Sequence, residues 1–378
     1  MVRNVLFVGL CAGVVAVGCS LLNPLDGYSG GVTTDAVAPP ADVVAPLEAS
    51  LPDTSTSDAG CVSARPPPRP PASGNPDGGS TTVVAAISSF ELGEKSDPKL
   101  AKRSGYDLDL LCTCPGTRAC APKSGAGVCD LPSGVDNSGG AWLLGLVSLQ
   151  GSEFGSGVST GAEGLLMRIR NYNDLPDDDD VEVALFDTFG AEVFQPDAGG
   201  GPLKRDGTDR WTVDAKSLLG GTPYLPVAVD TRAYVRGGVV VAEIRFPFRV
   251  GDITFPISAG YVTASLVKLP TGYYALENGI LSGRLNASEF LTAFETLASS
   301  APGPGYLCGS DPIYASVRDG FCRVLDLPTD PTTDGREGPC DAVSLVIGFA
   351  ASPAVLGNVV QRPRPPRPCG NDWVGRCP

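Results

Sequence analysis

Apolar residues occur at every second position in several short runs after residue 82. The clearest runs are Leu165, Met167 and Ile169; Val181, Val183 and Leu185; and Ala242, Ile244, Phe246 and Phe248. Because successive side chains of a β-strand point to opposite faces, this spacing predicts half-buried strands. Glycine- and proline-containing turns separate the runs, and no regular alternation of strands with helices indicates a parallel sheet. We therefore predict a mainly β fold, an antiparallel β-sandwich or jelly roll with one or two short helices in the C-terminal part.

Two segments in the C-terminal part have helical patterns instead. Residues 286–299 begin with Asn286, which can cap a helix, and Glu289 follows three positions later, as in a capping box. Apolar side chains at helical spacing then form one stripe. These are Phe290, Leu291, Phe294 and Leu297. A second, weaker helix is predicted for residues 314–325, and the apolar segment 342–351 is predicted to return to the sheet.

The first residues have the pattern of an export signal. Arg3 precedes an apolar run at residues 5–18, which has the length of a signal h-region and is too short to span a bilayer. The run leads into AVGCS at residues 16–20, which resembles the lipobox of bacterial lipoproteins. The resemblance implies cleavage before Cys19 and attachment of lipid to its sulfur. The alternative is an ordinary secretory signal with an incidental cysteine.

The predicted location is the cell envelope. Several acyl chains on Cys19 would anchor the protein stably to a membrane. No later segment is apolar for the roughly 18 residues that a transmembrane helix needs. In lipoproteins of this kind the residue after the cysteine influences sorting, and Ser20 in place of aspartate implies the outer membrane if the host is Gram-negative.

Composition divides the chain into four predicted parts. Residues 1–18 form the signal peptide, and residues 19–80, rich in Pro, Ala, Ser and Gly without apolar periodicity, form a disordered tether. Residues 81–361 form the β-rich domain, with 81–270 and 271–361 as candidate subdomains. Residues 362–378 form a Pro- and Arg-rich tail that contains two cysteines.

Cysteine usage predicts disulfide bonds. Of 12 cysteines, Cys11 lies in the signal and Cys19 at the anchor, which leaves ten. An even number in an exported protein indicates disulfides. The ten are Cys61, Cys112, Cys114, Cys120, Cys129, Cys308, Cys322, Cys340, Cys369 and Cys377. We predict two bridges within residues 112–129 and three among the other six; the alternative for the C-x-C-x5-C-x8-C spacing is a metal site.

Charge and histidine content exclude several functions. The net charge of −14 argues against nucleic acid as a partner, because nucleic-acid binding needs a basic surface. The chain has no histidine, so neither a Ser-His-Asp nor a Cys-His catalytic arrangement can form. A hydrolase that uses only carboxylates stays possible, because glycoside hydrolysis requires just two acids.

Acidic residues near the cysteine-rich loop are candidates for a cation site. Asp107, Asp109 and Asp136 bracket the loop in sequence and could meet in space. Calcium takes six to eight oxygen ligands from such residues, so a structural calcium ion is the candidate cofactor; the alternative is an ordinary solvated cluster. The run at 177–180 is predicted to be a solvated hairpin tip.

Several motifs resemble uncharacterised, cysteine-containing surface lipoproteins of myxobacteria. They are FELG at 90–93, GYDLD at 105–109, CTCP at 112–115, GVDNS at 134–138, DGTD at 206–209, and Trp211. The resemblance implies an exported, anchored and β-rich protein, and it implies nothing about a substrate.

Taken together, the patterns predict a non-catalytic binding or structural module on a membrane anchor. Its expected ligand is a glycan, a peptidoglycan element or another envelope protein, and the alternative is a carboxylate-based polysaccharide hydrolase. No catalytic residue is assigned. Exposed aromatic side chains would favour sugar binding, and the candidates are Tyr234, Tyr261, Tyr273 and Tyr274.

Overall fold

A computed structural model describes the greater part of the chain after residue 61. The described residues are 62–72, 79–92, 104–113, 119–121, 128–150, 156–194, 201–223, 225–250, 253–296, 306–309, 311–361, 369–370 and 373–378. The predicted signal, Cys19 and most of the predicted tether therefore lie outside them.

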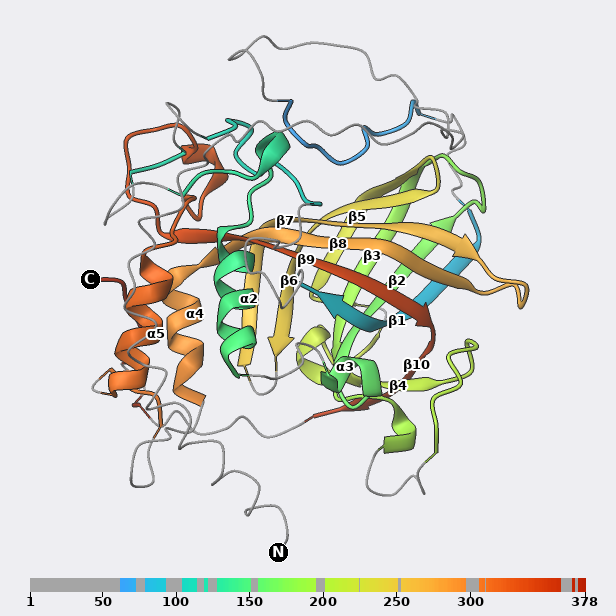
Figure 1. The fold of residues 1–378 in the computed structure, drawn as a ribbon. Helices are drawn as coiled ribbons and strands as arrows, with labels where there is room; N and C mark the ends of the chain where they lie inside the picture. The colour runs from blue at the N-terminus through green and yellow to red at the C-terminus, as the bar shows by residue number, and fades with distance from the viewer. Residues whose placement is uncertain are drawn as a thin grey trace, which may run out of the picture. The chain divides into compact units, whose positions relative to one another are not determined.

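The central feature is a closed antiparallel β-barrel in the order β1-β2-β3-β5-β6-β7-β8-β9 (Figure 1). Its strands are β1 (Thr81–Glu91), β2 (Gly164–Tyr172), β3 (Asp178–Thr188), β5 (Ala228–Arg236), β6 (Val239–Val250), β7 (Ile253–Lys268), β8 (Tyr274–Asn286) and β9 (Ala342–Pro353). The first strand pairs with β2 on one side and with β9 on the other, so the sheet closes on itself.

The predicted sandwich or jelly roll is therefore wrong, although the fold is mainly β. A sandwich needs strands divided between two sheets, whereas here one continuous sheet curls until its edges meet. Irregular pairing accompanies this curvature. The register between β7 and β8 shifts between Ser258 and Tyr261, where Ala259 has a φ of 45°. A β-bulge of this kind bends a strand and increases its twist.

Alternate side chains of all eight barrel strands form one apolar core. Met167, Val183, Ala242 and Leu281 are typical, each at most 1% exposed. An eight-stranded barrel is just wide enough for side chains to fill its interior. The predicted period-two runs in β2, β3 and β6 supply a large share of this core, which confirms that they are strands.

Three helices lie side by side at the end of the barrel where β8 ends and β9 begins (Figure 1). They are α2 (Ser138–Gln150), α4 (Ala287–Ala293) and α5 (Pro312–Cys322); a short α3 (Ser156–Thr160) lies near β1. Trp142, Phe290 and Phe321 pack together between them. The predicted N-cap is confirmed, since the Asn286 side chain accepts a hydrogen bond from the Glu289 N–H at 3.0 Å.

A second, smaller core lies between the barrel and a two-stranded parallel sheet. This sheet pairs β4 (Arg210–Asp214) with β10 (Val355–Val360). Trp211 and Val213 of β4 pack against Leu166 and Phe186 of the barrel. Side chains on both faces of β2 and β3 are therefore buried. This explains why residues between the barrel-core positions, such as Leu166 and Phe186, are apolar as well.

A proline-rich segment of the predicted tether lies against the barrel. Arg69 donates to the carbonyls of Asp179 and Arg232, and its guanidinium stacks 4.7 Å from the ring centroid of Tyr234. The Tyr234 hydroxyl donates to the Pro67 carbonyl. Aromatic docking of this kind suits an extended proline-rich backbone. Residues 62–72 are therefore part of the folded unit.

Candidate functional site

Three aspartates converge in the interior beside the barrel. Asp107, Asp109 and Asp136 are 2%, 5% and 1% exposed. One carboxylate oxygen from each lies within 4.8 Å of the others. The structure thus brings together the three acids that the sequence analysis had grouped only because they lie on either side of the cysteine-rich loop.

Backbone hydrogen bonds hold the two segments that carry these acids. The Asp136 N–H donates to the Tyr106 carbonyl at 3.1 Å, and the Leu108 N–H donates to Oδ2 of Asp136 at 2.6 Å. The Leu111 N–H donates to Oδ1 of Asp109 at 2.9 Å. Because these bonds use backbone groups, they fix the carboxylates independently of neighbouring side chains.

The tight turn before Asp136 depends on a glycine. Gly134 has a φ of 67°, a left-handed conformation that glycine adopts without strain. A Cβ at this position would lie 2.7 Å from Oδ2 of Asp107 and 2.8 Å from Sγ of Cys112. The absence of a side chain therefore lets the turn approach the cluster.

Two oxygens of the cluster have no hydrogen-bond donor among the described residues. Oδ1 of Asp107 and Oδ2 of Asp109 are buried, and neither is bonded within the part of the chain that is described. A buried carboxylate oxygen is costly unless a donor or a cation compensates it. The cluster is therefore an incomplete polar arrangement.

Two further acids extend the cluster. Asp130 accepts hydrogen bonds from the backbone N–H and the hydroxyl of Thr113. Asp326 accepts from the Ser344 N–H at 2.8 Å and from the Ser344 hydroxyl at 2.5 Å. Both acids act electrostatically on Asp136. These partners satisfy Asp130 and Asp326 to a degree that Asp107 and Asp109 do not reach.

Burial and mutual repulsion raise the pKa values of the cluster. Burial raises the pKa of Asp109 to about 8, and the carboxyls of Asp107 and Asp130 add to the shift. The pKa of Asp136 is also raised well above its usual range, mainly by burial and then by Asp109. The main electrostatic influences on both groups are other carboxylates, so these acids keep their protons at pH values where an ordinary aspartate is ionised.

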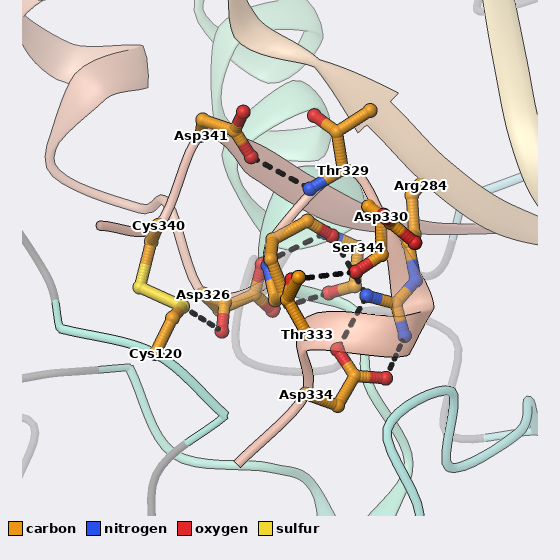
Figure 2. The surroundings of a disulfide bond; sticks show 11 residues. Cys120, Arg284, Asp326, Thr329, Asp330, Thr333, Asp334, Cys340, Asp341 and Ser344 are labelled. Atoms are coloured by element: carbon orange, nitrogen blue, oxygen red, sulfur yellow. Dashed lines mark hydrogen bonds and ion pairs between the residues drawn. A yellow bond between two sulfur atoms is a disulfide. The ribbon is translucent and has the colours of Figure 1, made fainter. Parts of the chain in front are cut away.

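A buried arginine supports the cluster from the barrel. Arg284 of β8 is fully buried, and its two Nη atoms bind both oxygens of Asp334 at 2.7 and 2.5 Å (Figure 2). The same guanidinium donates to the carbonyls of Pro328 at 2.7 Å and Leu108 at 2.9 Å. Leu108 therefore links the two systems, because its N–H binds Asp136 and its carbonyl binds Arg284.

A disulfide bond lies next to this network. Cys120 and Cys340 are bonded across 220 positions of sequence, and Sγ of Cys120 lies 3.2 Å from the Asp326 carbonyl oxygen (Figure 2). We predicted that Cys120 would pair within residues 112–129, and that grouping is wrong. The bond ties the cysteine-rich loop to the segment before β9, which sequence spacing could not indicate.

The remaining cysteines agree with a disulfide-bonded protein. Cys308 pairs with Cys369, and Cys322 pairs with Cys377. Cys112 and Cys129 are also disulfide-bonded. The other predicted positions lie outside the described residues; they are Cys19, Cys61 and Cys114.

The other acidic segments serve as local turn partners. The Asn173 N–H donates to Oδ2 of Asp178, which is buried at the start of β3, so the predicted solvated tip is partly strand. Asp177 forms an exposed ion pair with Arg236 at 2.9 Å. Asp209 accepts from two backbone N–H groups of its own loop. Each of these carboxylates already has donors.

Three of the four candidate tyrosines are covered by other residues. Tyr234 lies under Arg69, Tyr261 packs edge-on against Tyr106, and Tyr274 is 7% exposed and donates to Asp174 at 2.6 Å. Tyr273 is 47% exposed. The four residues therefore do not form a common aromatic surface.

Sequence reasoning missed Asp130, Asp326 and Arg284. Each is a single charged residue in an unremarkable context, and the fold alone brings it to the cluster. No helix among the described residues is both long enough and apolar enough to cross a membrane. No family model, no curated protein and no solved structure matches the chain.

Proposed function

We propose that the chain is a lipid-anchored protein of the bacterial cell envelope, attached through Cys19, whose barrel is a non-catalytic binding or structural module. The burial of the converging carboxylates carries the non-catalytic part of this proposal. Asp107, Asp109 and Asp136 are at most 5% exposed. Polysaccharide hydrolysis requires two acids on either side of a cleft that admits the sugar.

Two cavities that lie among the described residues are both too small to admit a sugar. One lies under β4 beside Trp211, and the other lies between α2 and the barrel beside Trp142. Each has a volume of about 10 Å³. That volume accommodates about one water molecule, whereas small-molecule sites usually measure at least about 300 Å³.

The surface favours a protein ligand over a glycan. The tyrosines that would stack on sugar rings are mostly covered, whereas an apolar hairpin is exposed between β4 and β5. Its side chains Leu219, Leu225 and Val227 are 57%, 54% and 55% exposed. The Leu219 N–H donates to the Leu225 carbonyl at 2.7 Å, so the backbone presents these side chains in a defined arrangement. Exposed apolar groups that lie close together are typical of protein contacts.

The AVGCS sequence at residues 16–20 supports the anchor. Near the start of the described residues, Ala64 exchanges backbone hydrogen bonds with Ser133 and Asp107 at 2.8 and 2.9 Å. About 40 residues separate Cys19 from this point. If these residues form the tether predicted from their composition, they would reach about 35 Å on average, which would be enough to hold the barrel clear of a lipid surface.

Membrane fractionation tests the anchor. Cys19→Ala should move the protein from the membrane fraction to the soluble exported fraction and abolish labelling by radioactive palmitate. Cys11→Ala is the matched control, because it alters a cysteine within the apolar run and leaves residues 16–20 intact. Unchanged membrane retention of Cys19→Ala would contradict the proposal.

A binding assay tests the module. The mature protein in detergent is melted with peptidoglycan fragments, polysaccharides and solubilised envelope proteins, and sugar products are measured in the same samples. A specific envelope protein whose binding is lost in Leu225→Asp, and retained in the exposed control Val374→Asp, would support the proposal. Release of sugar products would instead establish the hydrolase alternative.

A further inference from the structure

We infer that Asp107, Asp109 and Asp136 form a calcium-binding site that joins the cysteine-rich loop to the barrel. The inference goes beyond the proposed function and does not depend on it. Two independent observations carry it. Three carboxylates converge within 4.8 Å, and two of their oxygens are buried without any donor among the described residues.

The spacing of the carboxylates suits a calcium ion. Calcium binds oxygen at about 2.3–2.6 Å, so oxygens on opposite sides of the ion lie up to about 5 Å apart. The separations within this cluster fall inside that limit. Magnesium binds oxygen at about 2.0–2.1 Å and retains much of its water, so a buried site of this width suits it less well.

The chemistry of the ligands is also specific. All three are carboxylates, which bind hard cations, and the chain has no histidine to recruit zinc or copper. The nearby sulfur of Cys112 belongs to a disulfide-bonded residue and lies 3.6 Å from Oδ2 of Asp107. A divalent ion would use the two oxygens that lack donors and would offset most of the charge of the three acids.

The position of the site defines what the ion does. Asp107 and Asp109 belong to the segment that precedes the cysteine-rich loop, and Asp136 belongs to the turn that precedes α2. Leu108, between the first two, is already bonded to Arg284 of the barrel. The ion would therefore lock the two ends of the loop to each other and to β8. Extracellular calcium, at millimolar concentration, would fill even a weak site.

The test measures calcium binding and thermal stability in the mature protein, purified in detergent with its disulfides intact. After treatment with EGTA, calcium is titrated by calorimetry at pH 8 and the melting temperature is recorded. One ion per chain should bind, and calcium at a hundredfold excess over its Kd should raise the Tm by about 5 °C. Magnesium should bind at least tenfold more weakly.

Variants assign the effect to the cluster. Asp109→Asn and Asp136→Asn should each lose the calcium-induced Tm shift. Asp180→Asn, at an exposed position near the start of β3, is the matched control and should keep the shift. If Asp136→Asn does not fold, Asp109→Asn alone decides, because its Oδ1 contact with Leu111 can be kept by the amide oxygen.

The inference is wrong if the metal-free protein binds no calcium up to 10 mM, a concentration roughly tenfold above the millimolar range outside cells. It is equally wrong if Asp109→Asn and Asp180→Asn respond to calcium alike. Neither result would bear on the anchor or on the ligand of the barrel, since those are measured by fractionation and by partner binding.

Discussion

Replacing the buried arginine of β8 is the sharpest test of how the cluster is held. Arg284 is fully buried and makes four hydrogen bonds, two to Asp334 and one each to the carbonyls of Pro328 and Leu108. Arg284→Met keeps much of the side-chain length and removes every donor. Asp334, whose side chain is 13% exposed, and the two carbonyls would then lose their partner.

The expected loss in free energy of unfolding follows from the burial of the Arg284–Asp334 ion pair. Removing one member of a buried ion pair costs about 3–5 kcal/mol, because the other charge stays desolvated and uncompensated. The matched control is Arg236→Met, which breaks a pair with Asp177 whose side chains are 40% and 50% exposed. Solvent and salt screen such a pair, so its loss should cost no more than about 1 kcal/mol.

Urea denaturation, followed by tryptophan fluorescence with disulfides intact, measures both losses. The double variant Arg284→Met with Asp334→Leu should be less destabilised than the sum of its single variants, since no buried charge is left unpaired. Equal losses for Arg284→Met and Arg236→Met, both below about 1 kcal/mol, would refute the assignment of Arg284 as the support of the loops.

Three further predictions concern the loop and the cluster. Replacing both Cys120 and Cys340 with serine should lower the free energy of unfolding by about 2–5 kcal/mol. This loss should exceed that from replacing Cys308 and Cys369 by about 1 kcal/mol, because the first bond spans 220 positions and the second 61. Equal losses in urea denaturation would contradict the loop-entropy argument. Gly134→Ala should lower the free energy of unfolding by about 1–3 kcal/mol, because the new Cβ would collide with Asp107 and the backbone at this position is left-handed. Gly338→Ala is the control, because a Cβ there faces open space, and it should change stability little in the same assay. In EGTA, the Tm should fall as the pH rises from about 4 to about 8: burial raises the pKa of Asp109 to about 8, so the folded state keeps a proton that the unfolded state has released. Asp109→Asn should flatten this slope, and an unchanged slope would show that another group titrates.

Local patterns were sufficient to predict individual elements. The alternating runs in β2, β3 and β6 and the capped helix at α4 are short-range features, because period and capping depend on neighbouring residues. The helix α2 escaped prediction. Its apolar residues surround the helix without a single stripe, so the sequence lacks the helical period that a half-buried helix shows.

The closure of the barrel was decided by tertiary structure. Residues 85–91 pair with residues 348–353, and the same alternating pattern is compatible with a sandwich, a jelly roll or a barrel. Strand bulges and the pairing of distant edges select the barrel, and neither is visible in the period of the strands. The disulfide partner of Cys120 depends on the same long-range arrangement.

The candidate site divides in the same way. The sequence alone determined which acids stand at the two ends of the cysteine-rich loop, and the lack of histidine excluded imidazole ligands there. Only the tertiary structure decided that Asp107, Asp109 and Asp136 face one another. It also decided that Asp130 and Asp326 lie beside them, and that Arg284 binds the backbone of Leu108, which lies between Asp107 and Asp109. Convergence of buried charges depends on contacts between segments far apart in the chain, which local pattern does not encode.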